Sequence, residues 1–121
     1  MTDGRVLAAL QTALGAGVPV RAAFSEAPAA VPRAVLRPAV YLPLCLDGTD
    51  ILLTEGVQQV ALAAHSYAQL TQLCAQAETA MRTLGYRLAD VQPAETPRGV
   101  TMTFRAVFDA EGNVYDEGVT I

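Results

Sequence analysis

The sequence has no lysine and no tryptophan, and it contains one histidine and two cysteines. A single histidine excludes a metal site built from several histidines. Two distant cysteines without a Cys-x-x-Cys spacing argue against a zinc site or a disulfide framework. Cys45 and Cys74 each lie among apolar neighbours. We therefore expect both to be buried thiols that act as small hydrophobic side chains.

A cluster of positive charge is also missing. The eight basic residues are all arginine and are scattered along the chain, whose net charge is -4. Four acids after residue 108 account for that net charge: Asp109, Glu111, Asp116 and Glu117. Nucleic-acid binding depends on basic side chains gathered against phosphates, so no nucleic-acid contact is predicted.

Long apolar runs are absent, and none approaches the ~20 residues that span a bilayer. We therefore expect no contact with a membrane. The first residues include both Asp3 and Arg5, and Gln11 and Thr12 interrupt the apolar stretch that follows. This pattern favours an amphipathic helix over a signal peptide, and a cytosolic origin is expected.

Length and composition favour one soluble domain covering residues 1–121. The chain is 52% hydrophobic but only 6% aromatic. A chain of this size buries roughly two-thirds of its unfolded surface. The core is therefore expected to be large enough without disulfides, and to be mainly aliphatic.

Two helices are predicted from hydrophobic periodicity. Apolar residues recur at helical spacing after Asp3, which gives a first helix at about 4–14, closed by Gly15. Ser66 can cap a second helix at about 66–84, before Gly85. The predicted apolar stripe of this second helix comprises Leu70, Leu73, Cys74, Ala77, Met81 and Leu84.

Strands are predicted in β-rich, alternating segments between turn residues. They are expected at 18–24, 39–46, 51–54, 57–65, 86–92 and 100–108, with a short addition at 113–116. In the segment 100–108, Met102, Phe104 and Ala106 should share one face. Pro43 is expected on an edge strand or at a bulge. The polar or proline-rich segments 25–38 and 93–99 are expected to be exposed loops.

This order of elements predicts the fold class. Strands joined by short turns favour a mostly antiparallel sheet of 4–6 strands. Two amphipathic helices have one apolar face each, so both should pack on that sheet. The expected architecture is an α+β two-layer sandwich.

The acidic end of the chain could be a calcium loop or a turn. A calcium-binding EF-hand loop needs Gly at its sixth position and Glu at its twelfth. Counted from Asp109, these positions hold Val114 and Thr120. Gly112 and Asn113 tolerate positive φ, so a turn is the favoured interpretation.

No catalytic constellation is visible. His65 stands beside Ser66, but adjacent residues rarely face each other, and a structural role for His65 is expected. Glu78 and Arg82 are spaced as an ordinary helix pair. Arg105 is expected on the solvated face, where it could pair with an acid across the sheet or mark a subunit contact. The sequence therefore predicts no enzyme activity, and no catalytic, cofactor-binding or metal-binding residue.

The chain resembles the small tail-terminator proteins of bacteriophages and prophages, which complete the tail and join it to the head. The strand VPVRAAF follows a short helix, and the strand VQQVALAAHS runs into the helix YAQLTQLCAQAETAMRTLGY. The strand VTMTFRAVFD and the short aromatic tail GNVYDEG then close the chain. The resemblance is one of layout and covers nearly the whole chain.

The resemblance implies a sheet with two packed helices and self-association into a hexameric ring. The implied partners are the tail tube protein and a head-completion or connector protein. The implied location is the host cytoplasm during assembly and then the virion tail. Segments 25–38, 93–99 and 109–121 would be the interfaces, and edge strands could pair between neighbours.

Three other functions remain open at this point. The chain could be another head–tail connector or a minor tail protein. It could be a small-ligand-binding regulatory α+β module, which would have a defined pocket. It could also be an enzyme that uses His65 with an acid, in which case His65→Ala would abolish activity and leave the fold intact.

Overall fold

The computed structural model describes residues 3–22, 31–48, 50–94 and 96–115, while the side chains of residues 3, 45–47 and 50–52 lie outside this description. The elements are α1 (Asp3–Leu14), β1 (Val20–Ala22), β2 (Arg33–Leu36), β3 (Val40–Asp47), β4 (Asp50–Ala63), α2 (Tyr67–Thr83), β5 (Arg87–Pro93) and β6 (Gly99–Asp109).

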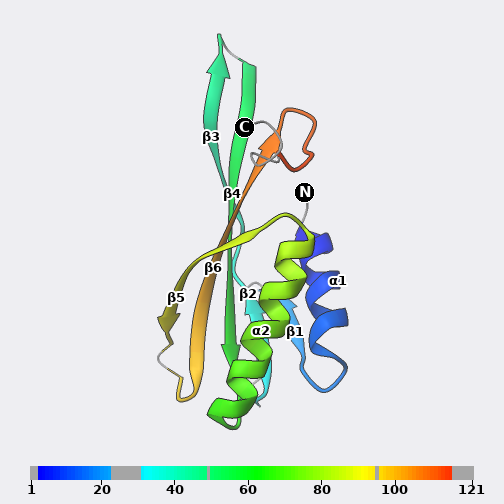
Figure 1. Cartoon of the computed structure of the whole chain (residues 1–121), viewed down its shortest axis with the longest axis vertical. Coiled ribbons are helices and arrows are strands. Elements are labelled where there is room, and N and C mark those ends of the chain that lie inside the picture. Colours follow the sequence, from blue (N-terminus) through cyan, green and yellow to red (C-terminus); the bar gives the residue numbers. More distant parts are fainter. Residues whose placement is uncertain (1–2, 23–30, 49, 95, 116–121) are drawn as a thin grey trace.

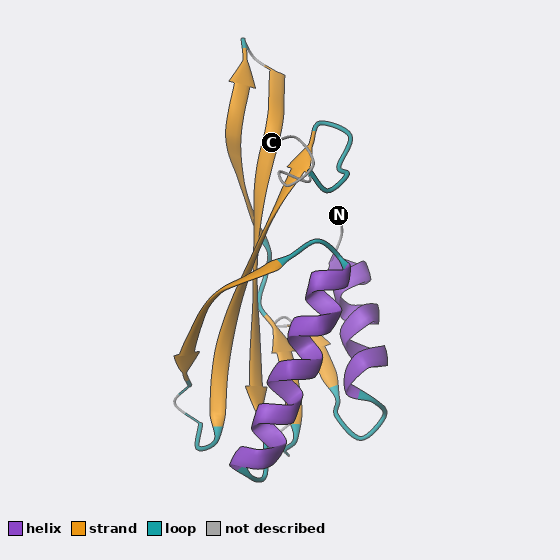
Figure 2. Cartoon of the chain, viewed as in Figure 1, coloured by secondary structure: helices purple, strands orange, loops and turns teal. Residues whose placement is uncertain are grey.

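These strands form one sheet in the order β1-β2-β4-β6-β5, and β3 also pairs with β4. All pairings are antiparallel except β1 with β2. The two helices lie side by side on the same face of the sheet (Figures 1 and 2). The predicted α+β fold, a mostly antiparallel sheet with two helices packed on it, is therefore confirmed.

The core lies between the helices and the sheet. On α2, Leu73 and Met81 are buried, and on β6 the alternate residues Met102 and Phe104 are buried. Ala106 is buried on the same face of β6, as predicted. The core also includes Val6, Leu10 and Leu14 of α1, Leu36 of β2, Val60 and Leu62 of β4, and Tyr86.

The ends of α2 follow from its sequence. The Ser66 side chain accepts a hydrogen bond from the backbone N–H of Gln69 (3.1 Å), which satisfies an otherwise unpaired N–H of the first turn. At the other end, Gly85 has φ of 93°, a conformation that glycine adopts without a steric cost. Both predicted helices are therefore confirmed to within a residue at each end.

The prediction of an exposed loop at 25–38 is wrong for Arg33–Leu36, which forms β2. Ala34 and Leu36 are buried, and β2 pairs with the last residues of β4, through Ala63. The surrounding prolines concealed this short strand in the sequence. Residues 23–30, with the expected end of the first strand at Phe24, lie outside the described residues.

The prediction of separate strands at 51–54 and 57–65 is also wrong, because β4 runs unbroken from Asp50 to Ala63. Gly56 does not interrupt it. A Cβ at Gly56 would lie 2.8 Å from Cε2 of Phe108, so this glycine permits the close approach of a ring.

The remaining strand predictions agree with the structure to within about two residues. The exception is the short strand at 113–116, where one isolated bridge joins Phe108 to Val114 and residue 116 lies outside the described residues.

Candidate assembly surface

The strands β3 and β4 form a hairpin that projects beyond the helices (Figure 1). The first half of β4 pairs with β3, and its last residues pair with β2 along the same edge. The helices cover only the end of the sheet that contains β2. We call residues 40–57 the projecting hairpin, and no helix in the described part of the chain packs against its outer part (Figure 2).

Four large apolar side chains of β3 are exposed on this hairpin. Val40 is 51% exposed, Tyr41 43%, Leu42 45% and Leu44 52%. Neighbouring residues of a strand point to opposite faces. Both faces of the hairpin therefore present apolar surface, which is uncommon outside interaction sites.

Among the described residues, no strand pairs with the outer edge of β3. Among the described residues β3 pairs with β4 alone, so its other edge carries backbone N–H and C=O groups with no strand partner. Residues 40–46 carry no charge, although charged side chains are a common protection of edge strands. Pro43 lies on this edge next to a register shift, as predicted from the sequence.

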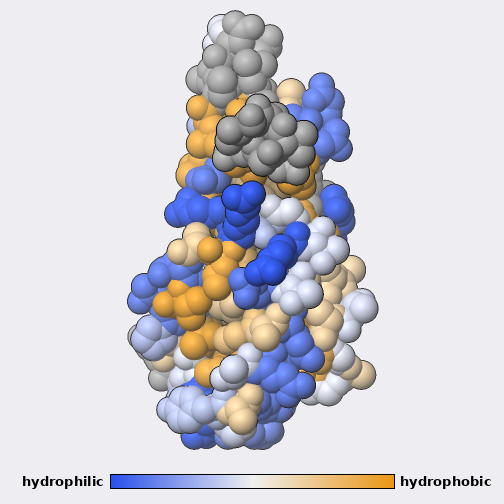
Figure 3. All heavy atoms as spheres, in the orientation of Figure 1, coloured by the Kyte–Doolittle hydropathy of each residue, from blue (hydrophilic) through white to orange (hydrophobic). Residues whose placement is uncertain are grey.

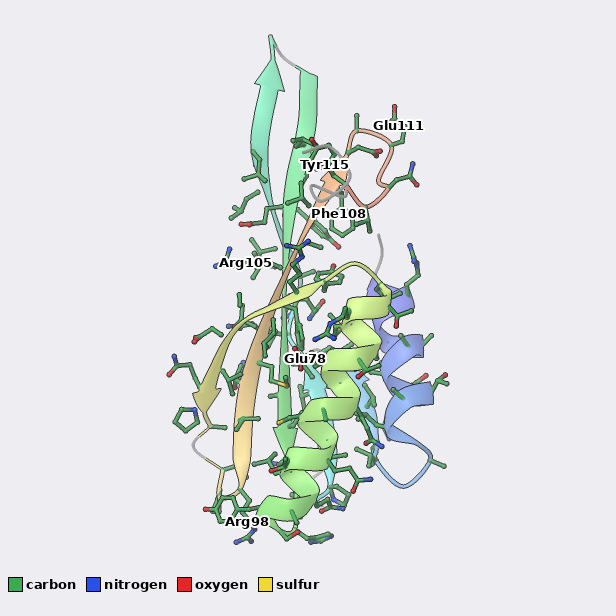
Figure 4. All side chains as sticks on the ribbon, viewed as in Figure 1. Glu78, Arg98, Arg105, Phe108, Glu111 and Tyr115 are labelled. Atoms are coloured by element: carbon green, nitrogen blue, oxygen red, sulfur yellow. The ribbon has the colours of Figure 1, made fainter. Side chains whose placement is uncertain are left out.

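The base of the projecting hairpin is tied to the core by aromatic packing. The Tyr41 ring lies 3.3 Å, and the Phe108 ring 2.8 Å, from the position that a Cβ at Gly56 would occupy. Phe108 in turn packs edge-to-face against Tyr86, with ring centroids 5.9 Å apart. These aromatic contacts connect the base of the hairpin to the core. Figure 4 labels Phe108 at this junction.

A second feature is a pocket of about 780 Å³ between the end of α2, the start of β5 and the middle of β6. Its charged lining consists of Glu78, Arg82, Arg87 and Arg105, and we call it the arginine pocket. Strongly hydrophilic atoms lie at the middle of the face shown in Figure 3.

Two of these arginines are in ion pairs. Nη2 of Arg82 lies 2.9 Å from Oε2 of Glu78, which confirms the predicted helix pair. Nη1 of Arg105 lies 2.8 Å from Oε1 of Glu55 on β4, which is the first of the two alternatives left open for this exposed arginine, a pair with an acid across the sheet.

A second hollow, of about 720 Å³, lies between the two helices. Its lining is mostly small and apolar, with alanines and threonines from both helices and Leu84 at one end. It offers space but no charged side chain with which to orient a ligand.

His65 lies between β4 and α2 with its side chain exposed. Its backbone N–H donates a hydrogen bond to Oε1 of Gln69 (2.8 Å), and the adjacent Ser66 hydroxyl is used as the helix cap. No described hydrogen bond joins the His65 imidazole to a carboxylate. The alternative function was an enzyme that uses His65 with an acid. Among the described residues, the structure does not place an acid against the His65 imidazole as a catalytic pair would require.

The first residues of the acidic segment, 109–113, form a turn held by Asp109. Its Oδ1 accepts hydrogen bonds from the backbone N–H groups of Glu111 (3.0 Å) and Asn113 (2.9 Å). Gly112 has φ of 85°, as a turn of this kind requires. The predicted turn is confirmed. The part of the chain that the structure describes contains no cluster of three or more potential metal ligands.

Cys74 is half-buried and packs against the core. Burial raises the pKa of its thiol, which disfavours the reactive thiolate. The Cys45 side chain lies outside the described part.

Sequence reasoning did not identify the exposed face of β3. The segment VYLPLCL is apolar at successive positions, and this pattern is also typical of a strand buried on both sides. Pro43 was the available signal that the strand lies at an edge.

Among the described residues, no helix is long and apolar enough to cross a membrane. No family model, curated protein or solved structure matches this chain. The exposed edge of β3 and the arginine pocket are therefore the observations on which a function must be built.

Proposed function

We propose that the chain is a non-enzymatic structural protein of a phage or prophage tail, and that it acts as a tail terminator. The exposed apolar edge of β3 is the observation that carries this proposal, because it suits a protein that works by joining other chains. The layout of helices and strands, which resembles that of tail terminators, supplies the specific role.

The edge of β3 suggests how subunits would join. A strand of a neighbouring subunit can extend the sheet at this edge through backbone hydrogen bonds. Burial of Val40, Leu42 and Leu44 would add hydrophobic stabilisation to the same contact. If the surface that meets β3 is a different part of the neighbour, the contact repeats head to tail and can close into a ring.

In this proposal the ring is hexameric and caps the tail tube. Its partners are the tail tube protein on one side and a head-completion or connector protein on the other. It forms in the host cytoplasm and remains in the virion tail. Another head–tail connector or a minor tail protein would use the same surface in a different position.

The test is deletion of the gene from the strain that encodes it, followed by induction of phage production and negative-stain electron microscopy of the lysate. We expect overlong or headless tails beside filled heads. Normal, infectious particles would contradict any essential role in the tail.

A small-ligand-binding regulatory module is the second candidate. The hollow between the helices favours it, since about 720 Å³ falls within the size range of small-molecule sites, roughly 300–1,000 Å³. This candidate predicts that a small apolar compound raises the melting temperature in a saturable way. An Ala9→Leu substitution, which would fill the hollow, should remove that rise.

A further inference from the structure

Two arginines face each other across the edge of the sheet. In the β5–β6 pairing, Arg87 is directly opposite Arg105. Residues in such a pair lie on the same face of the sheet, and like charges there destabilise the fold. Both side chains are exposed, so water reduces this cost but does not remove it. Placing Arg87 opposite Arg105 therefore does not help to stabilise the fold.

The carboxylates nearby compensate this charge only in part. Glu55 is paired with Arg105, and Glu78 with Arg82. Arg87 has no carboxylate within 4.0 Å among the described residues. Among the described residues that line the arginine pocket there are therefore three arginines and one carboxylate, although the net charge of the whole chain is -4.

The remaining walls of the pocket are largely apolar. They include Leu88 and Ala89 of β5, Val107 of β6, and Val114 and Tyr115 beyond the turn. Figure 4 labels Glu78 and Arg105 near the middle of the molecule and Tyr115 above them, next to Phe108. A ligand of this pocket would therefore meet guanidinium groups and apolar surface together.

We propose that the arginine pocket binds a carboxylate-bearing peptide segment of another protein chain, with Arg87 as the principal charged contact. The planar guanidinium group matches a carboxylate through two parallel hydrogen bonds. The apolar walls suit an aliphatic or aromatic side chain next to the acid. The pocket volume of about 780 Å³ accommodates a few residues.

A peptide fits these observations better than a nucleic acid. Nucleic-acid binding needs a track of basic side chains along many phosphates, and this pocket holds three arginines on an acidic protein. A free phosphate would use the arginines but would leave the apolar walls uncovered. This proposal does not depend on a role in a phage tail.

The experiment measures binding of a fluorescein-labelled synthetic peptide, VYDEGV, to the full chain by fluorescence anisotropy. This sequence, that of residues 114–119, places two carboxylates beside tyrosine and valine. The matched peptide VYNQGV has the same shape without the charges. The variants are Arg87→Gln and, as a control of equal charge change, Arg5→Gln on the exposed side of α1.

We expect VYDEGV to bind and VYNQGV to bind at least tenfold more weakly. Arg87→Gln should weaken binding of VYDEGV about tenfold, the effect of losing one charge-assisted contact, and Arg5→Gln should not. Because Arg87→Gln relieves the repulsion with Arg105, its melting temperature should equal or exceed that of the parent protein. That result would separate a binding role for Arg87 from a purely structural one.

Three results would overturn the proposal. The first is no binding of VYDEGV at about 1 mM, the weak limit of a useful peptide contact. The second is equal binding of the two peptides. The third is displacement of VYDEGV by an equal concentration of inorganic phosphate or of a short oligonucleotide, which would identify a general anion site.

Discussion

Gly56 shows how one residue fixes the junction between the projecting hairpin and the core. The position lies in the middle of β4, where Phe108 of β6 and Tyr41 of β3 approach from the two neighbouring strands. A side chain at this position would occupy the space of the Phe108 ring. The missing side chain therefore allows the aromatic contacts that connect the hairpin to Tyr86 and the core.

Gly56→Ala should destabilise the fold by about 1–3 kcal/mol, the usual cost of overpacking. The added Cβ would lie 2.8 Å from Cε2 of Phe108, so the ring must move. Gly17→Ala is the control, since a Cβ at Gly17 meets nothing within 4 Å. Urea unfolding of the two variants measures the difference. Equal stabilities would show that the Phe108 ring moves at no cost.

Leu73→Asp should unfold the protein. Leu73 is 3% exposed and lies on the face of α2 that packs against the sheet. An unpaired carboxylate at this position has no partner to offset its desolvation, and the expected loss exceeds about 3 kcal/mol. Gln72→Asp, on the exposed side of the same helix, should keep the far-ultraviolet circular dichroism and the melting transition. A folded Leu73→Asp variant would place the core face of α2 elsewhere.

At the scale of elements, α2 is specified largely by its own sequence, whereas β3 depends on its surroundings. The helix has a cap at each end and one buried stripe, which includes Leu70 and Ala77. The strand β3 is as apolar as a buried strand, yet its side chains are exposed because no helix covers it among the described residues. Its exposure is decided by where the other elements end.

Ser66→Ala should destabilise the protein by about 1 kcal/mol, because the backbone N–H of Gln69 loses its acceptor. The melting temperature should fall by a few degrees. Ser66→Asp should restore most of the loss, since an aspartate at this position can accept the same hydrogen bond. If Ser66→Asp melts as low as Ser66→Ala, the hydroxyl is not acting as a cap.

At the scale of the whole molecule, the fold combines a compact part with a projecting part. The helices cover one end of the sheet, and the projecting hairpin extends from the other end (Figure 1). The arginine pocket lies between these two parts. A chain of this shape can contact one partner through the hairpin and another near its middle, as the proposed assembly role requires.

The double variant Leu42→Lys with Leu44→Lys should stay folded, because both side chains are about half exposed. In the deletion strain it should fail to restore normal tails, because charge on β3 opposes pairing at that edge. Tyr67→Lys removes another exposed large hydrophobic residue, 72% exposed at the start of α2, and should restore normal tails. Restoration by the β3 double variant would show that this edge is not the assembly surface.

Local patterns made part of this structure predictable from the sequence. The two helices were predicted because each continuous segment contains its own apolar stripe, capping residue and closing glycine. The inward face of β6, with Met102 and Phe104, followed from simple alternation. The sequence also indicated the Glu78–Arg82 pair from its spacing, and it left an acid across the sheet open as one partner for Arg105.

The other features depend on contacts between segments that are distant in the sequence. β2 is a strand because Ala34 and Leu36 find partners in β4, which is distant in the sequence. The opposition of Arg87 and Arg105 depends on the register between β5 and β6. Helix caps and stripes are local interactions that one segment contains in full. Strand pairing, register and exposure depend on distant segments. The helices and the core faces therefore follow from local sequence, whereas the surfaces available for function arise from the packing of the whole chain.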